Sequence, residues 1–163
     1  VDFSDEKLLH SLDTWLAPYL SGINTVKALE ELDVHTMLLS ILSWEMQQRL
    51  DSLAPSYVKV PSGSKIYIDY SDSKKPFINV KIQEVFGLYE TPKVFNNTIA
   101  LQIHLLTPAM TPIQITYDLK SFWENSYAEV RKEVRGKYKR HYWPEDPFEA
   151  IATSKTKKHM MQR

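Results

Sequence analysis

The stretch TIALQIHLLTPAMTPIQITYDLKSFWENSYAEVRKEVRG, residues 98–136, contains two different hydrophobic periods. Its first part alternates apolar with more polar residues, and the apolar ones are Ile99, Leu101, Ile103 and Leu105. This alternation predicts a strand with one buried face, followed by the turn TPAMTP and a second strand over residues 113–116. Beyond residue 116 the apolar positions follow the helical period of 3.6. Strands followed by an amphipathic helix favour an α+β fold.

The helix expected over residues 116–135 is the clearest in the chain. Its apolar stripe consists of Leu119, Phe122, Trp123, Tyr127, Val130 and Val134. We expect Thr116 to cap its N-terminus and Gly136 to end it as the residue after the C-cap, where glycine is favoured. The basic residues of the last turn suit the negative end of the helix dipole.

The sequence pattern of residues 1–56 predicts a helical segment that leads into this domain. Ser4, Asp33 and Ser43 are candidate N-caps ahead of apolar stripes. Strands are predicted over residues 57–60, 65–70 and 77–82, and Asn96-Asn97 predicts a hairpin because asparagine tolerates positive φ.

The complete expectation is an α+β fold, in which an N-terminal helical segment precedes a small, mostly antiparallel β-sheet of about five strands packed against a C-terminal amphipathic helix. We assign residues 1–56 to the helical segment, 57–150 to the α+β domain and 151–163 to a basic flexible tail.

Composition limits the possible functions. The chain has 163 residues and no cysteine, which excludes disulfides and thiolate chemistry and suits a cytoplasmic location. No apolar run is long enough to span a membrane, and the N-terminus resembles no signal peptide. Because the sequence lacks an initiator methionine, we expect a fragment of a longer chain.

The zero net charge hides a gradient of −6 over residues 1–56, +2 over 57–116 and +4 over 117–163. A basic C-terminal part indicates an anionic partner, or else packing against the acidic N-terminal part.

Motifs for catalysis and cofactor binding are missing. PSGSK, residues 61–65, lacks the spacing of a phosphate-binding loop and predicts a turn. The five histidines form no metal-binding spacing, so we expect no metal site and no cofactor in this chain. The remaining alternative is a hydrolase that uses His104 or His141, with His104 and Asp118 as one conceivable acid–base pair.

The candidate functional site lies in residues 131–143. Six basic residues stand there against Glu133 alone, a net charge of +5, with aromatic residues between them. Cations that neutralise phosphates beside rings that stack on bases are typical of RNA binding. The candidate RNA-binding residues are Arg131, Lys132, Arg135, Lys137, Tyr138, Lys139, Arg140, His141, Tyr142 and Trp143. The alternative is that the rings of this segment cover the core while its cations face water.

The longest motifs resemble a known family. APSYVKVPSGSKIYIDYS, VKIQEVFGLYETPKV and LQIHLLTPAMTPIQITYDLKSFWENSYAEVRKEVRGKYKRHYWPEDP are similar to the C-terminal domain of bacterial HrpB-type ATP-dependent helicases of the DEAH-box class. WLAPYLSG and QQRLDSLAP resemble the stretch before that domain, so the likeness covers about residues 9–158.

The resemblance implies a parent enzyme whose other domains bind ATP and Mg²⁺ and hydrolyse the nucleotide. It implies no catalytic residue in this segment. Family members carry arginine and proline at the positions of Lys137 and Lys139, so this chain is more basic and less rigid there.

Two hypotheses follow. The first is a non-catalytic accessory domain of an RNA helicase that helps to bind single-stranded RNA through the basic and aromatic segment. The alternative is a docking module that contacts the helicase core domains of the same chain, or another protein, without touching RNA.

Overall fold

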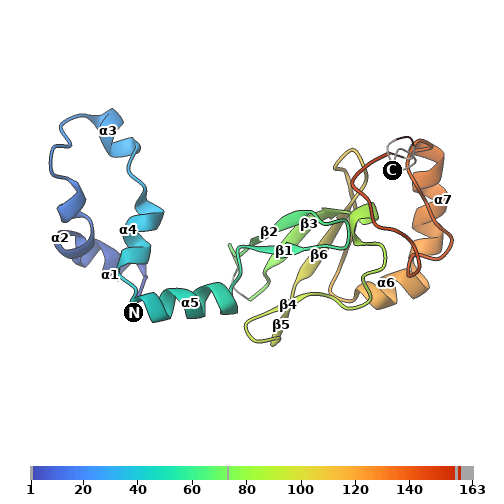
Figure 1. Cartoon of the computed structure of the whole chain (residues 1–163), viewed down its shortest axis with the longest axis horizontal. Helices are drawn as coiled ribbons and strands as arrows, with labels where there is room; N and C mark the ends of the chain where they lie inside the picture. Colours follow the sequence, from blue (N-terminus) through green and yellow to red (C-terminus); the bar gives the residue numbers. More distant parts are fainter. Residues whose placement is uncertain (1, 73, 157, 159–163) are drawn as a thin grey trace. The chain divides into compact units, whose positions relative to one another are not determined.

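The N-terminal helices begin where short polar side chains accept the free amide groups of a first turn. In the computed structural model, which describes residues 2–72, 74–156 and 158, Ser4 Oγ accepts a hydrogen bond from the Lys7 N–H at 3.4 Å. Asp33 Oδ1 accepts one from Thr36 at 3.0 Å. The helices are α1 (Asp5–His10), α2 (Leu12–Trp15), the 3-10 helix η1 (Ala17–Tyr19), α3 (Val26–Glu30), α4 (Val34–Ser40) and α5 (Trp44–Leu53) (Figure 1). The predicted helical segment is confirmed.

The chain divides into two units, Val1–Asp51 and Ser52–Arg163. In the first unit, Met37 is the one buried hydrophobic side chain among the residues described. Such a small core leaves large apolar side chains at the surface, and Trp44 is 75% exposed.

The second unit is built on a five-stranded sheet of order β1-β2-β3-β6-β7. Its strands are β1 (Tyr57–Lys59), β2 (Lys65–Asp69), β3 (Phe77–Lys81), β6 (Gln102–Leu106) and β7 (Pro112–Thr116). All neighbouring pairs are antiparallel except β3 and β6, which run parallel with Ile78 opposite Ile103. The expected small, mostly antiparallel sheet is confirmed.

A parallel pair requires a long crossover, and here the first part of the crossover, residues 82–86, is buried. It begins with the 3-10 helix η2 (Ile82–Val85) and continues through the hairpin of β4 (Lys93–Val94) and β5 (Ile99–Ala100). Asn96 and Asn97 have φ angles of 55° and 62°, as the hairpin prediction requires. The single strand expected from residue 98 to 106 is instead divided at Leu101 between two sheets.

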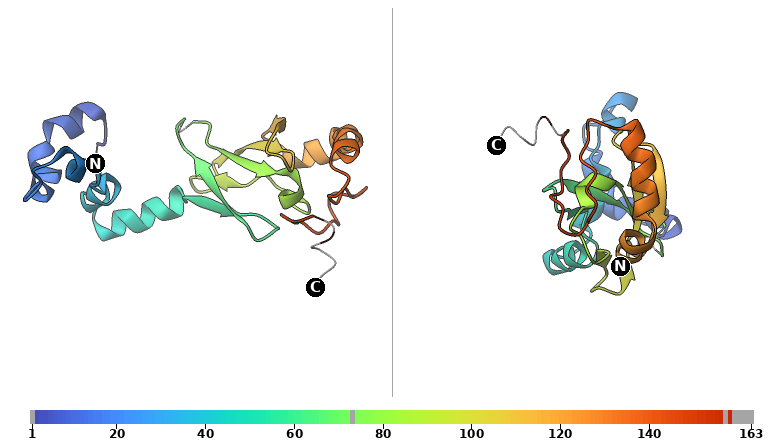
Figure 2. Two further views of the ribbon diagram at one scale, coloured as in Figure 1. Left: turned by 90° about the horizontal axis from the view of Figure 1, so that it is seen from above. Right: turned by 90° about the vertical axis from the view of Figure 1, so that its right-hand side faces the viewer.

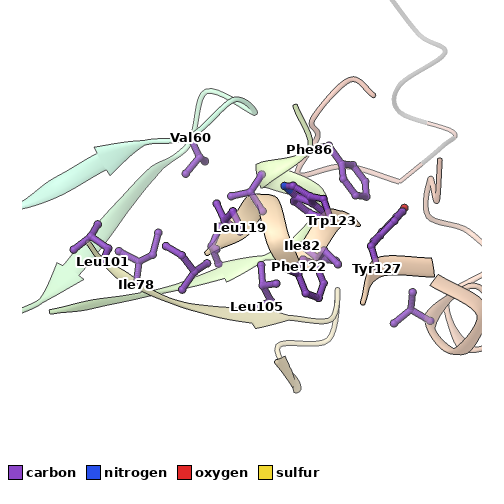
Figure 3. Close-up of a cluster of buried hydrophobic side chains, with 14 of the residues drawn as sticks. Val60, Ile78, Ile82, Phe86, Leu101, Leu105, Leu119, Phe122, Trp123 and Tyr127 are labelled. Atoms are coloured by element: carbon purple, nitrogen blue, oxygen red, sulfur yellow. The ribbon is translucent and has the colours of Figure 1, made fainter. Parts of the chain in front are cut away.

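The core lies between one face of the five-stranded sheet, the crossover and the C-terminal helices (Figure 3). Ile78 and Leu105 point from the strands, Phe86 follows η2, and Phe122 and Tyr127 come from the helices. The alternating pattern of β6 is reproduced in its burial, because Ile103 and Leu105 are fully buried while His104 between them is not.

The helix expected over residues 116–135 is two helices, α6 (Leu119–Asn125) and α7 (Tyr127–Lys137). The Asn125 side-chain amide donates to the Ser121 carbonyl at 3.0 Å, a local bond that competes with the helix ladder. The break at Ser126 lets the Tyr127 ring pack against Phe86 and Trp123, with ring centroids 5.9 and 5.4 Å away.

Both predicted helix ends were wrong. Asp118 caps α6, because its Oδ1 accepts from the Ser121 N–H at 2.9 Å, while Thr116 bonds Asp118 instead. Gly136 lies inside the last turn of α7, which ends only at the C-cap Tyr138. Tyr138 ends the helix because its hydroxyl is held by Thr107, 3.2 Å away in the turn after β6.

Replacing Gly136 by alanine should therefore stabilise the protein. Its position is helical, a Cβ there would meet no heavy atom within 4 Å, and alanine is favoured over glycine in a helix. We expect G136A to raise the free energy of unfolding by about 0.5–1 kcal/mol in chemical denaturation.

Gly87 provides the contrasting variant, since its φ of 78° is left-handed. G87A should lower the free energy of unfolding by about 1–2 kcal/mol. A loss of stability in G136A would contradict the helical assignment.

Candidate nucleic-acid interface

The segment after α7 folds back over the core. We call residues 138–153 the strap. Trp143 is 5% exposed and its indole N–H donates to the Tyr138 carbonyl at 2.9 Å. The Tyr127 hydroxyl donates to the Pro144 carbonyl at 2.9 Å, and burial raises the pKa of this phenol well above its usual value. The strap therefore wraps the core. This agrees with the interpretation in which the rings of residues 131–143 cover the core.

The strap then runs along the crossover that joins β3 to β6 (Figure 2). The Gly87 N–H donates to the Pro147 carbonyl at 2.8 Å, and Phe148 stacks on Tyr89 with ring centroids 4.3 Å apart. Thr153 is buried and its N–H donates to the Gln83 carbonyl at 2.9 Å. Of the tail expected over residues 151–163, positions 157 and 159–163 lie outside the described residues.

Two of the predicted RNA-binding cations are engaged within the protein. Arg131 Nε donates to the Trp143 carbonyl at 3.1 Å, and its Nη2 lies 3.3 Å from Glu145 Oε1. Lys137 Nζ lies 3.1 Å from Glu133 Oε1, one helical turn away. Arg131 therefore positions the strap, whereas Lys137 forms an exposed pair of the kind that contributes little stability.

Four other cations are exposed and free of acidic partners among the residues described: Lys132, Arg135, Lys139 and Arg140. Three of them, with Gly136, line an open surface hollow of about 490 Å³ at the end of α7. Clustered positive charge without neutralising carboxylates attracts a phosphate backbone.

The aromatic residues of the same segment are differently placed. Trp143 belongs to the core, and Tyr138 is half-buried with its hydroxyl bonded to Thr107. Tyr142 is also half-buried. The segment therefore presents cations to solvent while its largest ring is unavailable for stacking on a base.

His141 sits at the junction of the strap and the sheet. Burial lowers the pKa of its imidazole below the usual value, and the Lys81 ammonium lowers it further. Its Nδ1 is buried without a hydrogen-bond partner among the described residues. Lys81 ends β3, so the basic segment adjoins that end of the sheet.

The structure does not bring His104 together with Asp118. His104 Nδ1 lies 3.2 Å from Asn79 Oδ1 and Nε2 lies 2.9 Å from Gln102 Oε1, while Asp118 caps α6. Among the described residues no hydrogen bond or ion pair joins His104 to Asp118. Within the described residues no cluster of three or more His, Cys, Asp or Glu side chains could hold a metal ion, and no helix has the length and hydropathy of a membrane span.

Sequence reasoning missed Glu145 and Thr107, the partners of Arg131 and Tyr138. They lie 14 and 31 residues away along the chain. Each pair joins residues of different elements, so periodicity within a single element gives no signal for them.

The fold and this surface define an α+β domain with N-terminal helices and a cationic hollow. The family described as "HrpB_C: ATP-dependent helicase C-terminal" matches residues 15–147. The chain belongs to this family of helicase C-terminal domains, which confirms the resemblance found in the sequence.

One curated relative and two solved structures support the assignment. The chain is 43% identical over 155 residues to the ATP-dependent RNA helicase HrpB of Escherichia coli (strain K12), which covers 95% of this chain and 19% of the relative. A crystal structure of E. coli DExH-box NTPase HrpB has a TM-score of 0.85 at 43% identity, over 96% of this chain and 19% of that one. A crystal structure of E. coli DEAH/RHA helicase HrpB has a TM-score of 0.68 at 42% identity, over 88% of this chain and 18% of that one. The chain thus spans about a fifth of the length of these relatives.

The environment of His141 predicts a pH dependence of stability. Because its pKa in the folded state lies below the ordinary 6.5, the unfolded chain binds more protons at mildly acid pH. The contribution of the neutral His141 side chain to the free energy of unfolding is fully present above pH 6.5. It is lost as the pH falls toward the lowered pKa. We expect the free energy of unfolding to fall between about pH 7.5 and about pH 5.5, and H141Q to flatten this dependence.

The exposed His35 provides the control, and H35Q should keep the pH dependence of the unmodified protein. Identical pH profiles for H141Q and the unmodified chain, measured by chemical denaturation, would rule out a stability role for His141.

Proposed function

We propose that this chain is a non-catalytic accessory domain that helps an ATP-dependent RNA helicase to hold single-stranded RNA. The phosphate contacts are Lys132, Arg135, Lys139 and Arg140. In this proposal hydrolysis of the nucleotide, with ATP and Mg²⁺, belongs to other domains of a longer polypeptide. The cytoplasmic location stays a prediction.

The proposal rests on one observation: some cations of residues 131–143 are paired within the protein and others are not. Arg131 donates a hydrogen bond to the Trp143 carbonyl and is paired with Glu145. Four neighbouring cations have no acidic partner among the described residues. Like charges held close together on one surface repel each other, and an anionic backbone relieves that repulsion. The relative named as an RNA helicase makes RNA the anion to test first.

Changing the four free cations to alanine should lower the affinity for RNA and also make that affinity less dependent on salt concentration. Each phosphate contact on a single strand contributes about 0.7 to the slope of log K against log salt, so four contacts contribute up to about 2.8. We expect this loss of slope in fluorescence anisotropy titrations of a labelled single-stranded RNA. Arg131 is left intact in this variant because it holds the strap.

A charge-matched control removes Lys7, Lys27, Lys93 and Lys120, all of which are exposed. If RNA affinity followed net charge alone, this variant would weaken binding as much as the first. Equal effects of the two variants, or no RNA binding by the unmodified chain at low salt, would refute the assigned contacts.

The helical unit favours a second function, docking on other domains of the same polypeptide. Residues 1–56 carry a net charge of −6, and Leu9, Val26 and Trp44 are all at least 66% exposed. An apolar surface of this kind on so small a unit is typical of a protein contact. The docking partner is the rest of a helicase chain, because this chain spans only a fifth of its relatives.

We expect the chain to bind, in trans, a version of the longer polypeptide that lacks this segment. W44S should weaken that association at least tenfold in a pull-down or calorimetric titration, since large buried aromatics dominate interface energies. Ile151, which is 74% exposed and lies in the other unit, provides the control variant I151S. Undiminished association of W44S would contradict docking through this surface.

A further inference from the structure

The five-stranded sheet has a second face, opposite the core. Along β3 the buried Ile78 and Val80 alternate with Phe77, Asn79 and Lys81, which therefore point away from the core. The same alternation exposes Tyr67 on β2 and Ile115 on β7. We call this surface the open face; its side chains come from all five strands.

Aromatic rings gather on the open face. Tyr57 and Tyr67 are paired across β1 and β2 with ring centroids 6.3 Å apart, and Tyr67 is 74% exposed. Phe77 stacks on His104 with centroids 4.4 Å apart. Tyr117 lies just beyond the end of β7 and is exposed, and its hydroxyl accepts a hydrogen bond from the Gln102 side-chain amide at 2.8 Å. Exposed rings on a rigid sheet lose little entropy when a flat ligand stacks on them.

Cations flank these rings at one end of the sheet. Lys59 is paired with Lys65 across β1 and β2, and Lys65 Nζ lies 4.5 Å from the centre of the Tyr57 ring. Lys81 ends β3 on the same face, beside the strap residue His141. The carboxylate of Asp69 lies on this face toward the other end, where it accepts from the Ser71 N–H. The open face is thus basic at the end nearest the strap.

Uncharged hydrogen-bonding groups lie between the rings and cations. Asn79 and His104 are directly opposite each other on β3 and β6, and Gln102 is bonded to both His104 and Tyr117. Rings that stack, amides and imidazole that bond base edges or 2′-hydroxyls, and lysines that meet phosphates are the components of a surface for single-stranded RNA.

We propose that the open face binds bases of single-stranded RNA, with Tyr57 and Tyr67 stacking on them and Lys59, Lys65 and Lys81 contacting the backbone. This site rests on the proposed function and supplies what the strap lacks, large aromatic rings that are exposed to solvent. The contact between Tyr138 and Thr107, just after β6, holds the strap against the Lys81 end of the sheet. In this proposal one RNA strand contacts the cations of α7 and the strap and continues past Lys81 onto the open face.

The test compares two variants of the whole chain. Y57V/Y67V removes both rings and keeps strand propensity, whereas Y57F/Y67F keeps the rings. Stacking contributes about fivefold or more per base, so we expect Y57V/Y67V to bind a uridine oligomer of about 12 nucleotides roughly 30-fold more weakly. Y57F/Y67F should stay within about twofold of the unmodified chain.

An abasic oligomer of equal length isolates stacking from charge. Both variants and the unmodified chain should bind it alike, because it keeps the phosphates and lacks the bases. Unchanged uridine-oligomer binding by Y57V/Y67V would overturn the site. Equal losses for the two oligomers would overturn it as well.

Crosslinking provides a measurement on the unmodified chain that does not depend on the folding of any variant. With 4-thiouridine oligomers we expect adducts on peptides covering residues 57–69. Adducts confined to residues 131–143 would overturn the open face and leave the proposed function standing. Adducts on the open face together with normal binding by the four-cation variant would instead remove the proposed phosphate contacts. Complete failure to bind RNA would remove both.

Discussion

The structure depends on the burial of β6 between a parallel neighbour and an antiparallel one. Leu101, Ile103 and Leu105 are fully buried. A parallel partner cannot be reached by a tight turn, so the chain must cross from β3 to β6 through a long connection. That connection fills the core with η2 and Phe86, and the strap is bonded to it through Gly87 and Gln83.

This arrangement gives the residues after α7 two separate tasks. Carbonyl groups of the strap are bonded by Tyr127 and Arg131, and the Trp143 ring completes the core. The free cations of the strap, Lys139 and Arg140, are presented to solvent by that anchored segment. A cationic segment tied to a core can recognise a backbone at a smaller entropic cost than a free tail.

Much of the local structure could be predicted from the sequence. Ser4 and Asp33 act as caps, and Asn96-Asn97 forms the hairpin, because each depends on neighbours within a few residues. The prediction at Gly136 failed where a distant contact decided the geometry, since Tyr138 is bonded to Thr107. The cap prediction at Thr116 failed locally, because Asp118 accepts the Ser121 N–H in its place. The +5 segment was identified correctly as a charge cluster, but its spacing could not separate the structural Arg131 from the free Arg135.

The sequence by itself determined the fold class, the family and the position of the basic segment, because periodicity, capping and motif similarity are properties of neighbouring residues. The tertiary structure alone decided which cations are free, that Trp143 belongs to the core, and that Tyr57 and Tyr67 share a face with Lys81. These facts depend on strand order and on contacts between residues far apart in the chain, and such pairings are fixed only when the sheet and its crossover pack together.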